Sequence, residues 1–307
     1  MSHVYKTTNG YYYLRNNNDE IIESFGETPP IKYFPHIIEG DARKKIYEIP
    51  KETISLIITS PPYYNIKDYQ TYGEKQQIGY LQGYNEYINS LKEVWRGCYH
   101  TLHKGCRLCI NIGDQFTRTE DYGKHIAFPN HADIIKSCID LNLDYLGSII
   151  WQKLATCNTS GGASVLGSYP YPPNGLVSYN YEHILIFKKP GERPKVDEKI
   201  KKSSKISKND WFIFFNSPWK FAGKKQNGHI AQFPKELPQR LIRMFSFIGD
   251  IILDPFVGSG TTCIASIENR RKSIGIELNS KYIKLIEKNI QKTISTAGKH
   301  WRWEQLA

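Results

Sequence analysis

The stretch DIILDPFVGSGTT, residues 250–262, has the pattern of a buried strand, a glycine turn and the start of a helix. The strand ends in Asp254, glycines stand at 258 and 260, and Thr261 opens the helix. Glycine lets the backbone approach a ligand closely, and the first turn of a helix offers unpaired amides. A purely structural turn would have the same letters. No lysine follows the glycines and the third glycine of the dinucleotide fingerprint is missing, so a phosphate is not the obvious ligand.

An acidic residue strengthens the nucleotide interpretation of this loop. Glu277 ends the next expected strand, nineteen residues after Gly258. In nucleotide-binding α/β folds, an acidic side chain at this spacing usually holds ribose hydroxyls. The loop and Glu277 together favour an adenosine without a pyrophosphate.

Apolar patterns on both sides of this loop alternate between strand and helix. Helical spacing runs from Tyr84 to Leu102, and helices are also expected around 134–139 and 234–249 and from about Thr261 and Ser280. Alternation of this kind predicts an α/β fold with a doubly wound, mostly parallel sheet. The expected strands are 35–41, 53–59, 107–112, 145–151, 182–188, 250–254 and 272–277.

A second stretch, ITSPPYYNIKDY at 58–69, places two prolines directly after an apolar strand pattern. Proline cannot donate to a sheet ladder and forces its predecessor into an extended conformation, so the strand should stop here. The result is a rigid corner at a strand end with aromatic side chains at its tip.

Composition excludes several classes of protein. The chain has 307 residues, of which 40% are hydrophobic and 23% charged, values typical of a globular protein. We find no apolar stretch long enough for a membrane span and no signal-peptide pattern at the start, so we expect a cytoplasmic protein. The six cysteines suit reduced core thiols. A zinc site within CYHTLHKGCRLC, residues 98–109, is the less favoured alternative, and we expect no metal.

Positive charge is concentrated in one segment. Residues 188–225 contain twelve Lys/Arg and four Asp/Glu, so eight of the eleven net positive charges lie here. Aromatic residues from Trp211 to Phe221 are interleaved with them. This mixture suits a nucleic acid, because lysines neutralise phosphates while aromatic rings stack on bases or fill a small core of the segment itself. A solvated lysine-rich insertion explains the charge equally well.

The two motifs resemble those of the S-adenosylmethionine-dependent DNA amino-methyltransferases. Their signatures, (Ser/Asp/Asn)-Pro-Pro-(Tyr/Phe) and Asp-Pro-Phe-x-Gly-x-Gly-Thr, stand here at residues 60–63 and 254–261. The catalytic motif precedes the cofactor motif, as in the circularly permuted beta arrangement of that family. The resemblance covers nearly the whole chain, including EGDA at 39–42, YEHILIFKK at 181–189 and HIAQFPKEL at 229–237.

This resemblance implies a domain plan for a Rossmann-like methyltransferase. We expect an N-terminal extension at 1–34, where Asn9-Gly10 suggests a hairpin, and a catalytic half at 35–189. A small basic target-recognition lobe is expected at 190–228 and the cofactor-binding half at 229–307.

The resemblance also implies roles for residues. The catalytic corner would comprise Ser60, Pro61, Pro62 and Tyr63, with Ser60 and the Pro61 carbonyl accepting hydrogen bonds from the target amino group and Tyr63 stacking on a flipped base. S-adenosylmethionine would be held by Asp41, Asp254, Phe256, Gly258, Gly260, Thr261 and Glu277. An alternative for Asp41 is a turn residue after a strand.

The methyl acceptor and the partners follow from the same resemblance. Serine at the head of the proline motif is typical of cytosine-N4 methyltransferases, so we favour N4 of cytosine in duplex DNA over N6 of adenine. An RNA amino-methyltransferase and a purely binding module are further alternatives. Residues 219–226 and 158–178 are candidates for base readout. We expect a restriction-modification context with a cognate endonuclease, in a monomer or homodimer. The phosphate contacts would come from Lys199, Lys201, Lys202, Lys205, Lys220, Lys224 and Lys225.

Overall fold

The computed structural model describes the chain in several ranges. These are residues 3–6, 12–15, 21–25, 35–64, 77–79, 83–116, 122–124, 126–154, 171–175, 177, 179–223 and 233–297. Most of the expected readout segment 158–178, together with Lys224 and Lys225, lies outside them.

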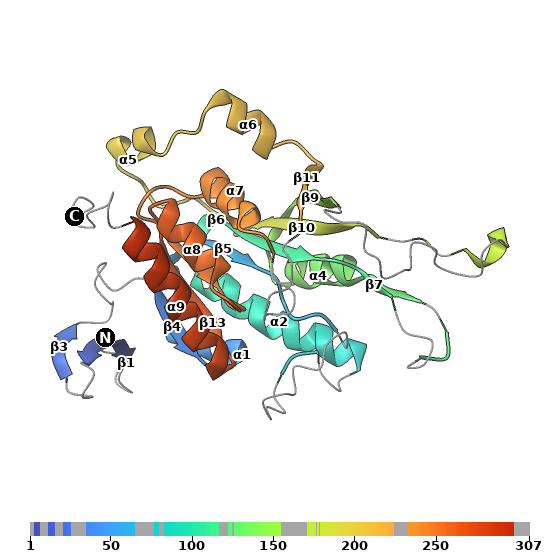
Figure 1. Ribbon diagram of the computed structural model, residues 1–307, viewed down its shortest axis with the longest axis horizontal. Helices are drawn as coiled ribbons and strands as arrows, with labels where there is room; N and C mark the ends of the chain where they lie inside the picture. Colours follow the sequence, from blue (N-terminus) through green and yellow to red (C-terminus); the bar gives the residue numbers. More distant parts are fainter. Residues whose placement is uncertain are drawn as a thin grey trace.

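An eight-stranded, mostly parallel sheet forms the centre of the molecule (Figure 1). Its spatial order is β11-β9-β10-β6-β5-β12-β13-β4, and β10 runs antiparallel to both of its neighbours. The alternation therefore predicted the sheet correctly. The strands are β4 (His36–Glu39), β5 (Ile54–Thr59), β6 (Leu102–Ile112), β9 (Asp144–Leu154), β10 (Tyr181–Lys188), β11 (Trp219–Ala222), β12 (Ile251–Asp254) and β13 (Lys272–Glu277).

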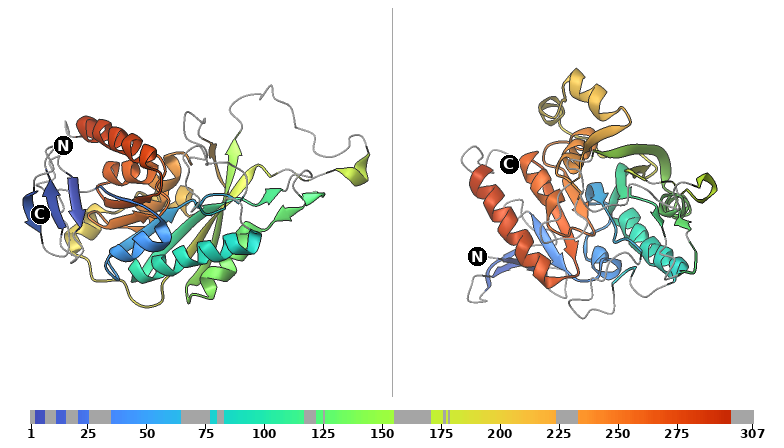
Figure 2. Two further views of the ribbon diagram at one scale, coloured as in Figure 1. Left: turned by 90° about the horizontal axis from the view of Figure 1, so that it is seen from below. Right: turned by 45° about the vertical axis from the view of Figure 1, so that its right-hand side comes forward.

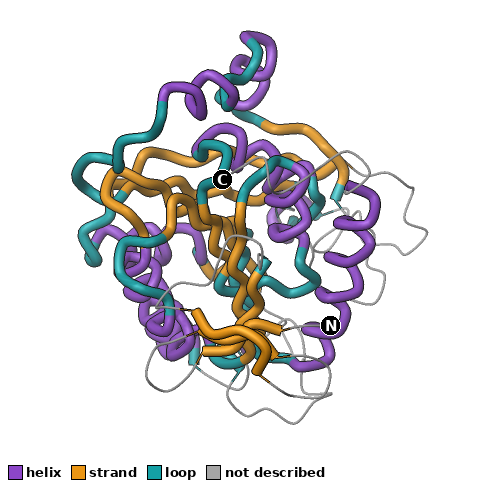
Figure 3. The backbone as a smooth tube through the Cα atoms, turned by 90° about the vertical axis from the view of Figure 1, so that its left-hand side faces the viewer, coloured by secondary structure: helices purple, strands orange, loops and turns teal. Residues whose placement is uncertain are grey.

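Helices cover both faces of this sheet (Figures 2 and 3). Alternate residues of β5 face opposite layers, as expected for a strand buried on both sides: Ile57 packs toward α2 and α4, and Leu56 toward α7. No helix in the described ranges is long and apolar enough to cross a membrane. The helices are α1 (Ala42–Lys45), α2 (Tyr84–Thr101), α4 (Asn130–Ile139), α5 (Glu198–Ser203), α6 (Lys208–Phe214), α7 (Glu236–Phe245), α8 (Thr261–Glu268) and α9 (Ser280–Ala297), with short 3-10 turns at Ile46–Glu48 and Pro172–Asn174.

Two small antiparallel sheets accompany the central one. Near the N-terminus, β1 (His3–Lys6), β2 (Tyr12–Arg15) and β3 (Ile21–Phe25) pair in that order. The second contains β7 (Gln115–Phe116), directly after β6, and β8 (Ala127–Phe128), directly before α4.

The strand order identifies the ligand-binding edge of the sheet. If β12 is counted as the first strand, then β4, β13, β12, β5 and β6 have the order 3-2-1-4-5 of a doubly wound nucleotide-binding sheet. The half that contains β12 thus comes last in the chain, which is a circular permutation. In such sheets ligands bind beyond the carboxyl ends of the strands where the order reverses, here between β12 and β5.

The basic insertion is not a self-contained lobe. Its strand β11 joins the central sheet parallel to β9, with Trp219 opposite Trp151. Phe214 and Trp219 are buried, and Trp219 packs into the core of the central sheet rather than into a core of the segment itself. Trp211, Phe212 and Phe215 are 55%, 61% and 42% exposed, so these rings do not fill a core, and their stacking on bases stays a prediction. The helix α6 has only seven residues and packs mainly on α7, so the rings on its other sides stay uncovered.

Candidate active site

The proline corner lies at the carboxyl end of β5, next to the switch point. Pro61 and Pro62 lack amide hydrogens, so the strand ends at Thr59 as predicted. The Tyr87 hydroxyl donates to the Pro62 carbonyl at 3.0 Å, and the Gln115 side-chain amide donates to the Tyr64 carbonyl. These two hydrogen bonds fix the backbone of the corner at Pro62 and Tyr64.

The corner also carries two hydrogen-bond acceptors that the described residues do not use. Within those residues, no hydrogen bond reaches the Ser60 side chain or the Pro61 carbonyl. Ser60 is only half-buried, whereas Pro61 is buried. A hydroxyl oxygen and a carbonyl oxygen on adjacent residues are therefore available to a ligand with N–H groups.

Asp254 connects this corner to the glycine loop. Its carboxylate accepts from the hydroxyls of Thr59 at 2.8 Å and Thr262 at 2.6 Å, and from the Phe256 amide at 3.0 Å. Burial raises the pKa of Asp254 to about 6, and the bonds from Thr262 and Thr59 oppose that shift. With three donors on two buried oxygens, the side chain fixes β5, β12 and the start of α8 relative to one another. This geometry suits a residue that supports the loop better than one that contacts a ligand directly.

The glycine loop adopts backbone conformations that side chains disfavour. Gly258 and Gly260 have φ angles of 54° and 84°. A Cβ at Gly260 would lie 3.0 Å from the Ile286 side chain, so the loop and α9 can approach this closely only with glycine there. Thr261 is the first residue of α8 and is buried.

Glu277 faces this loop from the end of β13. It accepts from the Gly258 and Asn279 amides, both at 2.9 Å. Burial raises the pKa of Glu277 to about 7, against the effect of these two bonds. The structure therefore brings Gly258 and Glu277 into direct contact, as their spacing in the sequence suggested.

Two further predicted cofactor residues have clear local surroundings. Asp41 caps α1 by accepting from the Arg43 amide at 2.9 Å, and its carboxylate also pairs with the Arg43 guanidinium at 2.6 Å. This is the turn function considered as the alternative for Asp41, and its contact with a cofactor stays a prediction. Phe256 is partly buried and meets Trp95 edge-on, with ring centroids 6.4 Å apart.

Tyr63 is surrounded by polar residues that sequence reasoning missed. Burial, followed by the nearby Glu182 carboxylate, raises the pKa of Tyr63 well above its usual value. Glu182, on β10, also accepts from the Asn111 amide at 2.6 Å and from the Lys153 ammonium. Glu182 lies in the block YEHILIFKK, where an acid inside an apolar strand pattern was a signal that could have been used.

A cluster of titratable groups adjoins this network. His131 Nδ1 lies 2.7 Å from Asp114, and its ring stacks on that of His183 with centroids 4.1 Å apart and planes 8° from parallel. The possible ligand atoms of Asp114, His131 and His183 all lie within 4.8 Å of one another, close enough to suggest a metal site. However, nearly parallel rings do not direct their nitrogen lone pairs to one point, so this arrangement is poorly suited to a shared metal ion. Burial and the neighbouring His131 lower the pKa of His183.

The cysteines that could have formed the less favoured zinc site are core residues. Cys98, Cys106 and Cys109 are buried free thiols, and burial raises the pKa of each. Cys98 belongs to α2 and Cys109 to the sheet.

The predicted DNA-binding lysines lie in two different places. Lys220 is exposed on β11, opposite Gln152 near the carboxyl end of β9, at the same edge of the sheet as the proline corner. Lys199, Lys201, Lys202 and Lys205 are exposed on or directly after α5. Residues of α5 lie beside Gly249 and Asp250, where β12 begins, and beside Arg270 and Lys272, where β13 begins. The structure thus places this group at the opposite edge, and its contact with DNA stays a prediction.

Comparison with known proteins agrees with this geometry. The family model described as DNA methylase, of the N6/N4 methyltransferases, matches residues 54–288. The chain is 36% identical over 280 residues to the type II methyltransferase M.MjaI of Methanocaldococcus jannaschii, covering 83% of this chain and 90% of that protein. It is 33% identical to the type II methyltransferase M.MthZI of Methanothermobacter thermautotrophicus, covering 82% and 75%.

A solved structure extends the likeness to three dimensions. TTHA0409 of Thermus thermophilus, described as a DNA modification methylase and complexed with S-adenosyl-L-methionine, superposes with a TM-score of 0.68 at 34% identity. The match covers 84% of this chain and 95% of that one. On the extent of the family match and these identities, the chain belongs to the DNA methylase family of N6/N4 methyltransferases.

Proposed function

We propose that this DNA methyltransferase transfers a methyl group from S-adenosyl-L-methionine to the exocyclic N4 amino group of cytosine in duplex DNA. The observation that carries the proposal is the pair of available acceptors at the corner, the Ser60 hydroxyl and the Pro61 carbonyl, beside the Asp254 loop. An exocyclic amino group has two N–H bonds and therefore matches two adjacent acceptors.

The chemistry explains why the corner is rigid. The lone pair of an exocyclic amino nitrogen is delocalised into the ring, so the nitrogen is a weak nucleophile. Hydrogen bonds to Ser60 and Pro61 favour a pyramidal nitrogen with its lone pair directed at the methyl group, and positioning of this kind is a major source of rate. The nitrogen gains the methyl group as the bond between that methyl and the donor's sulfur breaks, with the electron pair left on sulfur, and the nitrogen releases one proton to solvent. The Tyr87 and Gln115 bonds keep the corner in place during the reaction.

The residues at the switch point fit the methyl donor. S-adenosyl-L-methionine supplies an electrophilic methyl group on sulfur when it is bound. The left-handed glycines of the loop leave its backbone open to close approach, and Glu277 offers carboxylate oxygens for ribose hydroxyls. Phe256 and Thr261 belong to the same loop. Asp254 supports that loop by accepting hydrogen bonds from the Phe256 amide and the Thr262 hydroxyl.

A covalent mechanism through cysteine, as in carbon methylation of cytosine, does not suit this corner. The five cysteines in the described ranges are buried free thiols, and none belongs to residues 60–64. Cys263, in α8, has its pKa raised to about 12 by burial. Transfer to a nitrogen needs no such nucleophile.

We favour cytosine over adenine as the methyl acceptor because residue 60 is serine, which is typical of the cytosine-N4 methyltransferases that the sequence resembles. A neutral hydroxyl accepts a weaker hydrogen bond than the carboxylate found in the Asp-Pro-Pro-Tyr variant. N6 of adenine is the alternative acceptor, since both bases offer an amino group to the same two oxygens. The likeness to type II methyltransferases supports a restriction-modification context with a cognate endonuclease.

Labelled S-adenosyl-L-methionine tests the function directly. The protein should transfer label to duplex DNA, and more to duplex DNA than to single-stranded DNA or total RNA. Ser60→Ala and Tyr63→Ala should each lower turnover at least about 100-fold, as expected when positioning is lost. Cofactor affinity, measured by calorimetry, should change little because neither side chain belongs to the glycine loop.

A matched control distinguishes a loss of catalysis from a loss of folding. Ser148→Ala removes a half-buried serine hydroxyl from β9, which is separated from β5 by two strands, and it should leave turnover near the wild-type value. Wild-type turnover in Ser60→Ala would contradict the proposed role of the corner.

A further inference from the structure

The sheet separates the target-binding corner from most of the positive charge of the insertion. Ser60 and Asp254 lie at the carboxyl ends of β5 and β12, whereas α5 lies where β12 and β13 begin. The Arg193 guanidinium bonds Asp250, and the Ile248 amide donates to Ser204 Oγ at 2.9 Å, so this segment is fixed to that edge. A six-residue strand such as β5 spans about 20 Å. A straight duplex that lies across the carboxyl edge of the sheet, with its axis crossing the strands, would therefore meet the corner but not α5.

Charge on and around α5 is largely uncompensated. Asp197 is used as the cap of α5, Glu198 pairs with Lys201 at 2.5 Å, and Asp250 pairs with Arg193. Within the described residues, Lys199, Lys202 and Lys205 are left without an ion pair, and all three are exposed. Exposed cations without acidic partners create a positive field that attracts polyanions.

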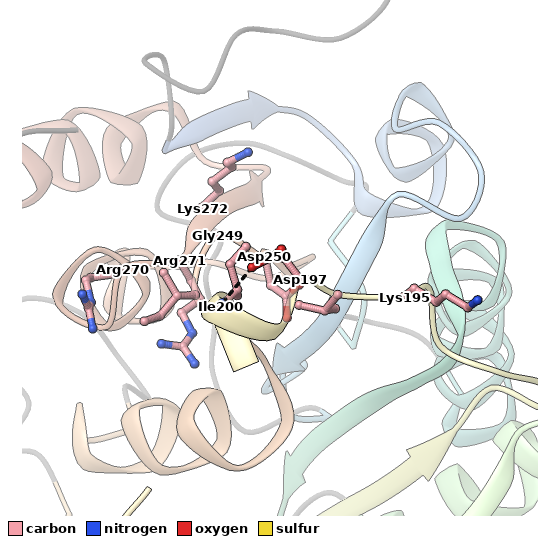
Figure 4. A pocket seen from close by; sticks show the side chains of 10 residues that line it. Lys195, Asp197, Ile200, Gly249, Asp250, Arg270, Arg271 and Lys272 are labelled. Carbon is pink, nitrogen blue, oxygen red and sulfur yellow. Dashed lines mark hydrogen bonds between the residues drawn. The ribbon is translucent and has the colours of Figure 1, made fainter. Parts of the chain in front are cut away.

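The cavity beside α5 is not itself the anion site. It has a volume of about 330 Å³ and is lined by both carboxylates and basic residues. Figure 4 shows Asp197 and Asp250 near its middle, with Lys195, Arg270 and Lys272 directed outward and away from one another. An anion inside the cavity would meet carboxylates, whereas a long polyanion could cross the outer surface.

Exposed rings follow these lysines in the chain, on α6. Trp211 and Phe212 are 55% and 61% exposed, and Figure 1 shows α5 and α6 following one another along the outer rim of the molecule, joined by a short length of chain. Large apolar side chains gathered on one exposed helix mark an interaction surface. Their combination with unpaired lysines suits a nucleic acid, because rings contact bases or sugars while lysines contact phosphates.

We propose that Lys199, Lys202 and Lys205 with Trp211 and Phe212 form a second DNA-contact face, which binds a DNA segment other than the one at the corner. The proposal rests on the proposed function, since it assumes that DNA is the substrate. Contacts of lysines with phosphates read no sequence, so this face holds DNA of any sequence near the enzyme while the corner meets its target. A DNA that bends around the molecule, or two separate segments, would occupy both edges.

Binding stoichiometry tests the second face. Duplexes of about 12 base pairs are far shorter than the persistence length of DNA, roughly 150 base pairs, so each stays straight and cannot bend from one edge to the other. The wild-type protein should therefore bind two of them in sedimentation or calorimetric titrations at low salt. The triple variant Lys199→Gln, Lys202→Gln, Lys205→Gln should lose at least tenfold in affinity for one duplex and keep the other. Lys220→Gln, at the corner edge, should retain the duplex that depends on α5.

Matched controls distinguish a local contact from total charge and from protein association. The triple variant Lys136→Gln, Lys284→Gln, Lys288→Gln removes the same charge from exposed sites on α4 and α9 and should still bind two duplexes. Trp211→Phe should abolish part of the fluorescence change that the second duplex causes. Equal losses in both triple variants, or a single bound duplex in the wild type, would overturn the second face.

The remaining outcomes also decide between interpretations. If Phe212→Ser changes the oligomeric state but not the number of bound duplexes, the rings serve a second copy of the chain and the proposal is wrong. If two duplexes bind as expected but no methyl group reaches DNA, the second face stands and the proposed reaction fails. If DNA is methylated while only one duplex ever binds, the reaction stands and the second face fails.

Discussion

At the scale of single residues, the site depends on side chains whose polar atoms are already arranged before a ligand arrives. Glu277 holds the Gly258 amide, and the corner acceptors stand beside a loop that Asp254 organises. Preorganised groups need little rearrangement during the reaction, which is why they can position a weak nucleophile.

The raised pKa of Glu277 predicts that the affinity for S-adenosyl-L-methionine depends on pH. Its pKa is raised to about 7, so it is largely protonated at pH 6 and ionised at pH 8. An ionised acceptor binds hydroxyls more strongly, by roughly 1 kcal/mol, so with a pKa of about 7 the affinity for S-adenosyl-L-methionine should rise about three- to fourfold from pH 6 to pH 8. Calorimetry across this range measures the rise.

Glu277→Gln is the control for this rise in affinity. The amide keeps an acceptor oxygen but does not titrate, so the variant should bind more weakly at pH 8 and show a flat profile. A wild-type profile that falls with pH, or a variant with the wild-type slope, would show that Glu277 does not contact the cofactor.

At the scale of elements, one buried carboxylate joins two strands and a helix. Thr59 ends β5, Asp254 ends β12 and Thr262 lies in the first turn of α8, and the two hydroxyls bond to different oxygens of Asp254. This triad fixes the proline corner and the glycine loop relative to each other, although they are almost two hundred residues apart in the chain.

Removing one hydroxyl from this triad should destabilise the protein in a pH-dependent way. Thr59→Val leaves the buried Asp254 with fewer donors and should lower the free energy of unfolding by about 1–3 kcal/mol. The pKa of Asp254 is already raised above its unfolded value of 3.8 to about 6. Because the native state binds the proton more tightly, stability falls as pH rises through that window, and the variant extends the fall. The loss should be larger at pH 8 than at pH 5, as urea unfolding can measure.

Thr53→Val provides the comparison for Thr59. The Thr53 hydroxyl donates to the Pro50 carbonyl at the surface, at 2.9 Å, so its removal should change stability by less than about 0.5 kcal/mol. If Thr59→Val costs no more than this, or costs the same at both pH values, the triad does not stabilise the site as described.

At the scale of the whole molecule, local patterns predicted the fold and the two motifs. Prolines, glycines and alternating apolar runs act over a few residues, so the corner, the loop and the position of Glu277 could be predicted from the sequence. The place of Glu182 beside Tyr63, and of Lys153 beside Glu182, could not, because it depends on the register of β9, β10 and β6. The location of α5 was also missed, since a short polar helix has no apolar pattern that shows where it packs.

The arrangement also separates two groups of lysines, predicted to contact DNA, that the sequence combines in one segment. Lys220 on β11 lies at the edge of the corner, whereas the lysines of α5 lie at the opposite edge. The insertion therefore crosses from one edge of the sheet to the other between residues 198 and 222. Base readout near the target is more consistent with β11 than with α5.

The central claim is that the Ser60 corner methylates an exocyclic amino group of a DNA base. The most direct measurement is mass spectrometry of nucleosides from duplex DNA treated with the protein and S-adenosyl-L-methionine. We predict N4-methyldeoxycytidine, absent when Ser60→Ala replaces the wild type at equal cofactor occupancy. N6-methyldeoxyadenosine would keep the corner but change its target base. The account would be contradicted by 5-methyldeoxycytidine, or by no methylated nucleoside from a protein that binds both DNA and cofactor.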